Sequence, residues 1–130
     1  MGTIAKLSRQ GDARVESMPG FEGRYVEADG YVLGLESFEQ AADFTPMYRG
    51  LPDDLCQSHH WGYVIKGRMI FHRPEGDVVF EEGDAYYAGP GHTGEVGLPG
   101  TQIVEFSPSD EYAQTMAVMA RNFKGGGEDR

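Results

Sequence analysis

The chain has 130 residues, of which 39% are hydrophobic, and it carries a formal net charge of −10 at pH 7. A chain of this length forms one domain around a single core. With 11 Lys and Arg against 21 Asp and Glu, it cannot neutralise phosphates, which excludes nucleic acid and anionic membranes as partners and favours a small-molecule ligand.

The cysteine count and the N-terminal sequence bear on the cellular compartment. Cys56 is the single cysteine, so the chain cannot form an internal disulfide. The opening MGTIAKLSRQ lacks the apolar stretch of a signal peptide, and no later segment is long and apolar enough to cross a bilayer. We therefore expect a cytoplasmic protein.

The first predicted elements are two short strands within GRYVEADGYVLGLES. They flank Asp29-Gly30, a dipeptide suited to a tight hairpin because both residues tolerate positive φ. The connector from Phe38 to Asp53 follows, and it has no sustained period and contains two prolines. Because it is long and contains apolar side chains, we expect it to cover one end of the folded domain.

Further strand patterns follow in WGYVIKG, RMIFHR, VVFEE, AYYAG and TQIVEFS, with Gly-rich turns between them. Short strands at regular spacing predict an all-β sandwich or barrel.

From Ser109 the apolar period becomes helical, which predicts an amphipathic helix over about 109–124. Ser107 or Ser109 can cap its start, and Gly125 is expected to end it. We expect the helix to lie on the outside of the barrel, with a solvated tail over 125–130. A partner-binding face is the alternative role for its apolar stripe, which comprises Tyr112, Met116, Met119 and Phe123.

Two stretches, DDLCQSHHWGYVIKG and GDAYYAGPGHTGEV, together resemble the two motifs of the cupin superfamily. The resemblance implies a single cupin domain over 1–130, built as a jelly-roll barrel (a double-stranded β-helix) with its core at about 31–107. It also implies a homodimer, since small cupins often pair through the outer sheet. Cupins include metal-dependent enzymes as well as non-enzymatic binding proteins, so the resemblance specifies the fold more than the function.

The first cupin motif carries a His-x-His pair and a Glu before a glycine. Counting back from Gly67 places the Glu of the motif at His60, its second His at Cys56 and its first His at Asp54. All three residue types in this chain can bind a metal ion.

The second cupin motif carries a His after Pro-x-Gly. Counting forward from Gly91, this position falls on Gly94, and the nearest imidazole is His92, two residues earlier. Side chains two residues apart on a strand share a face, so His92 can still point into the barrel.

The resulting candidate metal ligands are Cys56, His60 and His92, with Asp54 as a fourth. Imidazole and thiolate ligands suit a borderline-soft divalent ion, so zinc is the first expectation and iron or copper the second. The alternative is that Cys56 is a small buried hydrophobic residue and His60 a hydrogen-bonded histidine of the barrel.

Strand alternation assigns other candidate site residues to one face or the other of their strands. Glu105 shares a strand face with Ile103, which makes it a candidate ligand or general base of raised pKa, unless this face is the solvated one. His59 lies on the opposite face from His60 and is expected on the surface. His72 has no acidic neighbour in register and is expected to be structural or exposed. Tyr86 and Tyr87 cannot both face inward, but one of them, with Trp61 or Tyr63, is a candidate for lining an aromatic pocket.

Three functions remain open at this stage. The first is a metal-dependent cupin enzyme that acts on a small organic substrate inside the barrel. The second is a metal-free barrel that binds a small molecule as a sensor or carrier. The third is a metal-free isomerase or lyase in which His60 and Glu105 are the catalytic proton-transfer groups.

Overall fold

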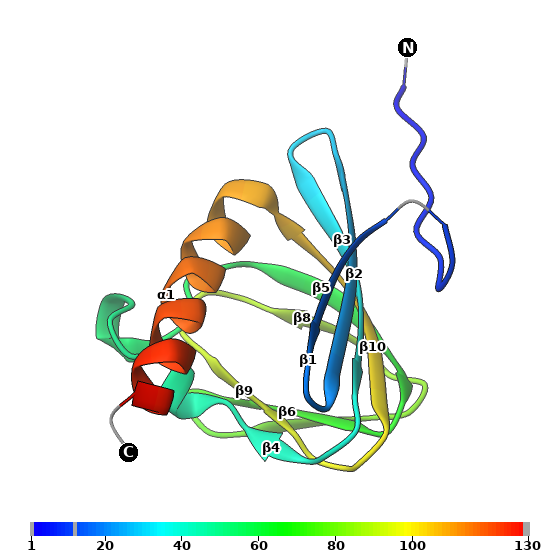
Figure 1. The fold of residues 1–130 in the computed structure, drawn as a ribbon. Coiled ribbons are helices and arrows are strands. Elements are labelled where there is room, and N and C mark those ends of the chain that lie inside the picture. Colours follow the sequence, from blue (N-terminus) through cyan, green and yellow to red (C-terminus); the bar gives the residue numbers. More distant parts are fainter. Residues whose placement is uncertain (1, 12, 129–130) are drawn as a thin grey trace.

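The computed structural model describes residues 2–11 and 13–128, and strands dominate this part of the chain. The strands form a six-stranded sheet in the order β1-β2-β3-β10-β5-β8 and a four-stranded sheet in the order β4-β9-β6-β7 (Figure 1). Their bounds are β1 Arg14–Met18, β2 Phe21–Ala28, β3 Tyr31–Phe38, β4 Ala42–Asp43, β5 His60–Lys66, β6 Arg68–His72, β7 Val78–Glu81, β8 Ala85–Ala88, β9 Thr93–Val96 and β10 Thr101–Pro108.

All strand pairs within the two sheets are antiparallel, and the sheets face each other across one apolar core. This arrangement confirms the predicted all-β jelly-roll barrel. The six-stranded sheet begins at Arg14, earlier than the expected start of the barrel core near 31. The buried residues of the core are Val64, Met69, Phe71, Tyr86, Ala88, Val96 and Ile103.

Strand alternation decides which side chains enter the barrel. In β5, His60 and Val64 are buried while Trp61 and Tyr63 are 43% and 44% exposed, because successive side chains of a strand point to opposite faces. The predicted hairpin is also present: β2 and β3 pair around Asp29 and Gly30, which have φ of 51° and 84°.

The connector between β3 and β5 is more structured than the sequence predicts. It contains the short strand β4 and two 3-10 helices, η1 (Thr45–Tyr48) and η2 (Pro52–Asp54). Tyr48 and Leu51 of this segment are buried and form a second apolar cluster with Cys56. The connector therefore packs against the barrel beside the candidate ligands.

The C-terminal helix α1 (Ser109–Glu128) starts where the sequence predicts, directly after β10. The predicted end at Gly125 is wrong, because glycine tolerates helical φ and ψ and the helix continues to Glu128. The predicted capping by Ser107 or Ser109 is also wrong, since the hydroxyl of Ser107 bonds to His60 and that of Ser109 has no hydrogen-bond partner among the described residues. Residues 129–130 of the expected tail lie outside the described residues.

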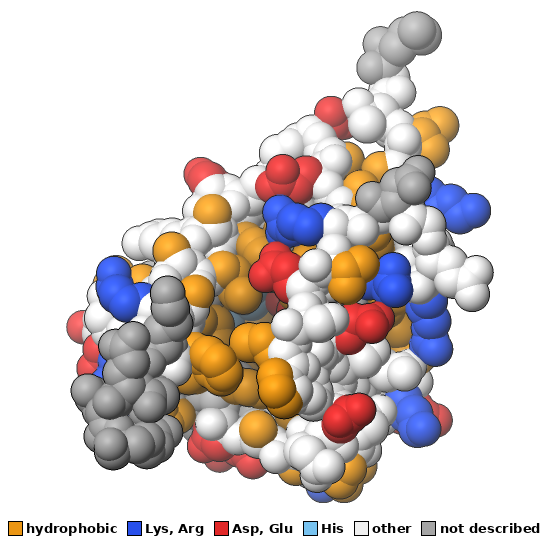
Figure 2. Space-filling model, viewed as in Figure 1, with side chains coloured by type: hydrophobic (Ala, Val, Ile, Leu, Met, Phe, Trp, Pro, Cys, Tyr) orange, Lys and Arg blue, Asp and Glu red, His pale blue; other side chains and the backbone are white. Residues whose placement is uncertain are grey.

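The helix lies across one end of the barrel and against η1, where Val118 and Met119 cover the second apolar cluster (Figure 1). In the space-filling view, apolar side chains gather along the seam between the helix and the first strands (Figure 2). No helix in the described part of the chain is long and apolar enough to span a membrane.

Candidate functional site

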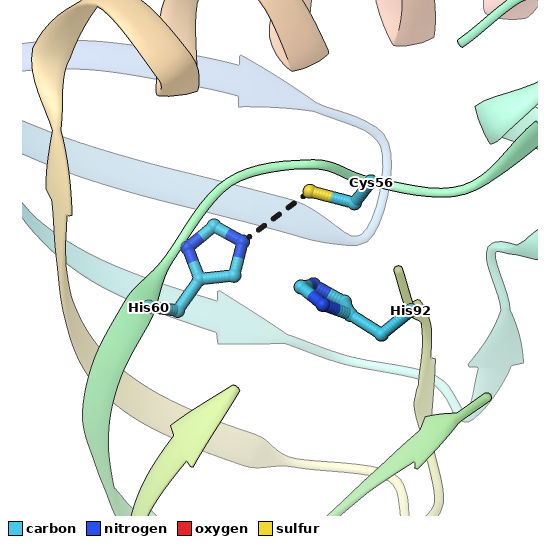
Figure 3. Close-up of side chains that lie close together, drawn as sticks. All are labelled: Cys56, His60 and His92. Carbon is cyan, nitrogen blue, oxygen red and sulfur yellow. Dashed lines mark hydrogen bonds between the residues drawn. The ribbon is translucent and has the colours of Figure 1, made fainter. Parts of the chain in front are cut away.

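Three potential metal ligands converge at the end of the barrel beneath α1 (Figure 3). Cys56 precedes β5, His60 begins it, and His92 precedes β9; one ligand atom from each lies within 4.8 Å of the others. The three residues are only 1%, 7% and 4% exposed. The structure thus brings together three of the four predicted ligands.

Backbone pairing places His92 in this group although it lies two residues before the motif position. The amide of Cys56 donates to the carbonyl of His92 at 2.7 Å, and the amide of Gly91 donates to the carbonyl of Cys56 at 2.7 Å. These bonds join the segment before β5 to the segment before β9. The thiol and the imidazole are therefore held side by side by main-chain atoms.

Hydrogen bonds on the far side of each imidazole fix its orientation. The Nδ1 atom of His92 lies 2.6 Å from the carbonyl oxygen of Gly89, which can only accept, so Nδ1 carries the proton. The Nδ1 atom of His60 lies 2.6 Å from the hydroxyl of Ser107 and 3.3 Å from a carboxyl oxygen of Glu105. If Nδ1 of His60 also donates, both Nε2 atoms keep the lone pair that a metal ion needs.

The electrostatics of the site suit neutral imidazole ligands. Burial lowers the pKa of His60 and of His92 to about 4, so both rings are uncharged near neutral pH. Burial raises the pKa of the Cys56 thiol, whose sulfur lies 3.5 Å from Nε2 of His60 and 3.3 Å from the hydroxyl of Thr115 in α1. A bound metal ion would have to displace the thiol proton.

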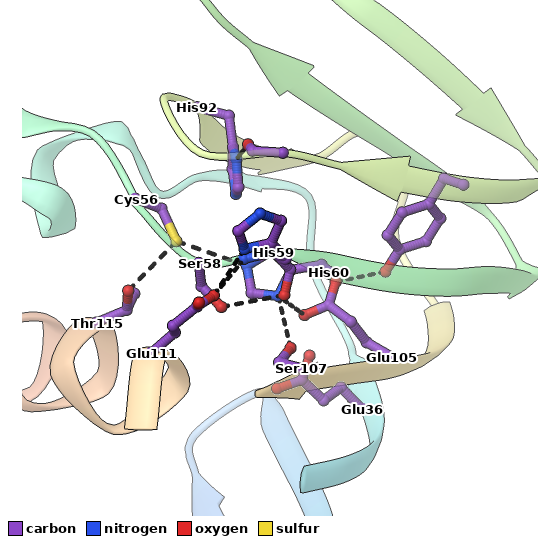
Figure 4. Close-up of polar contacts among 12 residues, drawn as sticks. Glu36, Cys56, Ser58, His59, His60, His92, Glu105, Ser107, Glu111 and Thr115 are labelled. Atoms are coloured by element: carbon purple, nitrogen blue, oxygen red, sulfur yellow. Dashed lines mark hydrogen bonds and ion pairs between the residues drawn. The ribbon is translucent and has the colours of Figure 1, made fainter. Parts of the chain in front are cut away.

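Two half-buried glutamates lie behind the imidazoles (Figure 4). Tyr86 donates its hydroxyl proton to Glu105 at 2.5 Å, and Tyr25 donates to Glu36 at 2.6 Å. Burial raises the pKa of the Glu105 carboxyl group to about 7, and burial together with the charge of Glu105 raises that of Glu36 to about 7. Glu105 therefore faces inward, as one reading of the alternation predicted.

Tyr86 reaches Glu105 because Gly62 leaves room for its ring. A Cβ atom at Gly62 would overlap the Tyr86 ring. Two residues of the site, Glu36 and Ser107, were not predicted as site residues. Strand alternation could have identified Glu36, since it shares a face of β3 with Val32 and Gly34, both of which are buried.

Asp54 does not join the ligand group. It lies in η2, its side chain is exposed, and its carboxylate accepts a hydrogen bond from the amide of Gly50 at 3.0 Å. Its left-handed φ of 59° turns the chain ahead of Cys56. Asp54 therefore shapes the segment that carries the thiol.

Most of the predicted aromatic pocket lies outside the barrel. Tyr86 is the inward residue, whereas Trp61, Tyr63 and Tyr87 are exposed on the outer face of the six-stranded sheet. The reason is strand parity, since His60 and Tyr86 occupy the inward positions of β5 and β8. The expected pairing of two copies through this face remains a prediction.

His59 lies outside the ligand group, as expected, and ties the barrel to α1. Glu111 accepts hydrogen bonds from the amide of His59 and pairs with its Nδ1 atom, both at 2.9 Å. These bonds lower the pKa of the Glu111 carboxyl group. The imidazole of His59 also stacks on Trp61, with ring centroids 6.2 Å apart.

A second group of potential ligands lies on the outer face of the four-stranded sheet and comprises Asp43, His72 and Glu95. The expectation that His72 has no acidic neighbour is wrong. Its Nε2 atom lies 2.8 Å from Glu95 and its Nδ1 atom 2.8 Å from Asp77. Since both ring nitrogens contact carboxylates, the geometry fits an imidazolium held between two acids better than a metal ligand.

His72 should make stability pH-dependent. Its hydrogen bond to Asp77, with that to Glu95, raises the pKa of the imidazole above 6.5 in the folded state. This stabilisation is present below pH 6.5 and is lost as pH rises through the folded-state pKa. In urea melts from pH 6 to pH 9, the parent should lose more stability than His72→Gln. Parallel pH dependences of the two proteins would contradict this assignment.

The interior next to the ligand group is closed. The space lined by Tyr25, Glu36, Glu105, Ser107 and Tyr112 is too small for a water molecule. Tyr112 comes from α1 and packs on Tyr25, with ring centroids 5.8 Å apart. A substrate inside the barrel therefore requires a side chain of α1 to move.

No protein-family model and no curated protein sequence matches the chain, but solved structures do. The structure of KdgF from Halomonas sp. is 21% identical over 78% of this chain and 90% of that chain, with a TM-score of 0.55. An RmlC-like cupin from Shewanella frigidimarina is 16% identical over 83% of this chain and 95% of that chain, with a TM-score of 0.55.

The oxalate decarboxylase of Lactobacillus farciminis, solved as a formate complex, is 17% identical over 83% of this chain. Its TM-score is 0.56, and the match spans 34% of that longer chain. At these identities the likeness shows the fold alone. The chain therefore has the cupin fold that its two motifs predict.

Proposed function

We propose that Cys56, His60 and His92 bind a divalent transition-metal ion, with zinc as the first choice and iron or copper as the second. The observation that carries this proposal is the convergence of a thiol and two neutral imidazoles within 4.8 Å in a buried site. A structural zinc site is normally closed by four protein ligands, whereas three leave a position for water or substrate. The ligand number therefore favours a catalytic site.

The fit of the residues to a metal ion is supported by their outer partners. Metal-binding histidines commonly donate their second ring proton to a carboxylate or a carbonyl oxygen. His60 has Glu105 and Ser107 in this position, and His92 has the carbonyl of Gly89. An ion held here would polarise a carbonyl group or activate water.

We further propose that the protein is an enzyme acting on a small organic substrate at this end of the barrel. Within the chain, Glu105 orients His60 and can hold a proton near neutral pH, because burial raises the pKa of its carboxyl group to about 7. Tyr86 fixes the other carboxyl oxygen. An oxalate decarboxylase is among the solved structures with this fold, which shows that the fold supports enzymatic chemistry.

Substitution of the ligands tests the metal proposal. We expect about one metal ion per chain in protein purified without a His tag. Cys56→Ser, His60→Ala and His92→Ala should each weaken metal affinity by about 100-fold or more, since two ligands hold a divalent ion poorly. His59→Ala serves as the control and should keep the affinity of the parent.

Elemental analysis and thermal melting with and without a chelator provide the measurements. A metal bound only by the folded state raises the melting temperature, so the chelator should lower that of the parent. A parent that contains no metal and melts identically with the chelator would rule the proposal out.

A metal-free acid/base enzyme is the second candidate function. It is favoured by the 3.3 Å contact between Nδ1 of His60 and Glu105, two groups able to exchange a proton. Activity that survives full metal removal but is lost in Glu105→Gln would support it. A barrel that binds a small molecule without chemistry would show neither effect.

A further inference from the structure

The candidate site is largely covered in this conformation. Its three potential ligands are at most 7% exposed, and the adjacent interior space is too small for a water molecule. A groove of about 430 Å³ lies on the outer face, where Leu55, His72 and Thr93 are among its lining residues, but none of the three potential ligands lines it. A substrate can therefore reach these ligands only if covering side chains move.

The strands surrounding the site cannot provide that movement at low cost. β5 is hydrogen-bonded to β10 on one side and to β8 on the other, and β10 also pairs with β3 along its whole length. Separating any of these pairs breaks several backbone hydrogen bonds together. The parts of the chain that cover the site without strand pairing are α1 and the 3-10 helices of the connector, and α1 reaches the sulfur of Cys56.

Four side chains of α1 cover the site. Thr115 places its hydroxyl 3.3 Å from the sulfur of Cys56, and Tyr112 fills the space beside Glu36 and Glu105. Val118 and Met119 pack on the apolar cluster of Tyr48, Leu51 and Cys56. Lifting Thr115, Val118 and Met119 would uncover the thiol of Cys56 and the imidazoles beside it.

Few polar contacts hold α1 in place. Toward its end, the side-chain amide of Asn122 donates to the carbonyl oxygens of Met47 and Arg49, both at 2.7 Å. Near its start, Glu111 binds His59, and the amide of Ser109 donates to the carbonyl of Gly30 at 2.8 Å. The start of α1 is therefore anchored to the sheet, and the hydrogen bonds of Asn122 hold the far end of the helix in place.

We propose that α1 is a gate over the candidate site, which opens by release of Asn122 from η1 and rotation of the helix about its junction with β10. Opening withdraws Thr115 from Cys56 and lifts Val118 and Met119 from the apolar cluster, while Tyr112 stays beside the anchored start. This proposal depends on the proposed function only for the identity of the ion or substrate that enters. The opening of the gate is a property of the fold and can be measured on metal-free protein.

Cys56 offers a probe of the gate because it is the single cysteine of the chain and is 1% exposed. At low urea, a thiol-specific reagent should modify Cys56 of the metal-free protein, because the movement of α1 exposes the thiol while exposing little other surface. The labelling rate should therefore depend weakly on urea below the unfolding transition and steeply within it.

Asn122→Ala should raise the labelling rate at low urea by roughly tenfold, because it removes two hydrogen bonds of the closed state. Gln114→Ala is the matched control, since Gln114 is exposed on the same helix, and it should label like the parent. The proposal is overturned if Cys56 reacts with the urea dependence of global unfolding at every concentration. It is also overturned if Asn122→Ala leaves the low-urea rate unchanged.

The same assay separates the gate from the metal site. Added Zn²⁺ should slow labelling of the parent if Cys56 is a ligand. If Cys56 is labelled quickly at low urea and zinc does not change the rate, the gate proposal is supported and the metal proposal is rejected. Labelling that occurs only by global unfolding, but is slowed by zinc, would reject the gate and keep the metal site.

Discussion

Glu36→Gln should stabilise the protein at pH 8 by about 1–3 kcal/mol and leave its stability at pH 4.5 nearly unchanged. Burial and the charge of Glu105 raise the pKa of the Glu36 carboxyl group from 4.5 to about 7. Gln is neutral at every pH, and its carbonyl oxygen can still accept the hydrogen bond from Tyr25.

The direction of this effect follows from proton linkage. Because the folded-state pKa of Glu36 is raised, the folded protein holds a proton that the unfolded chain releases above pH 4.5. The parent therefore loses stability as pH rises from 4.5 to about 7, and the loss persists above this range. The Glu36→Gln variant does not lose stability in this way, because its side chain does not titrate.

Urea melts at pH 4.5 and pH 8 provide the measurement. Glu27→Gln is the control, because Glu27 lies on β2 with its side chain exposed, and it should show no comparable gain. A Glu36→Gln variant that is destabilised equally at both pH values would show instead that the glutamate is needed in its charged form.

Ser107→Ala should weaken metal binding by about 10- to 100-fold, the usual cost of removing a partner that orients a metal-binding histidine. Its hydroxyl lies 2.6 Å from Nδ1 of His60, closer than the carboxyl oxygen of Glu105 at 3.3 Å. Without it, the imidazole has one partner instead of two, and its Nε2 atom is held less firmly toward Cys56.

Ser58→Ala is the matched control for this variant. Ser58 and Ser107 are both 1% exposed, but the hydroxyl of Ser58 donates to the carbonyl of His59 rather than to an imidazole. Metal affinity measured by competition with a chelator should fall for Ser107→Ala alone. Equal losses in both variants would indicate a general effect on the barrel.

The sequence predicted the barrel well because strand parity and glycine-rich turns are local. The same parity put Glu105 on one strand face with Ile103, and the structure shows that this face is the inward one. Strand parity could also have excluded Trp61 and Tyr63 from the interior, since an inward His60 forces its neighbour outward. The error lay in assigning aromatic residues to a pocket by type rather than by position.

Other features of the site depend on contacts between distant segments. His92 reaches the ligand group through backbone bonds to Cys56, which no spacing rule contains. His72 meets Asp77 and Glu95 because strand register brings them together. The apolar stripe of α1 predicted a buried face, but not that this face would cover Cys56.

Absorption spectroscopy of cobalt-loaded protein tests the metal site most directly, because Co²⁺ takes similar ligands to zinc and its bond to a thiolate absorbs light. Titration of metal-free protein with Co²⁺ should produce a thiolate-to-cobalt charge-transfer band that saturates at about one ion per chain, as expected for one site with a thiolate ligand. Cys56→Ser should lack this band, and His59→Ala should retain it. A parent that gives no charge-transfer band, or a band that persists in Cys56→Ser, would contradict the proposed site.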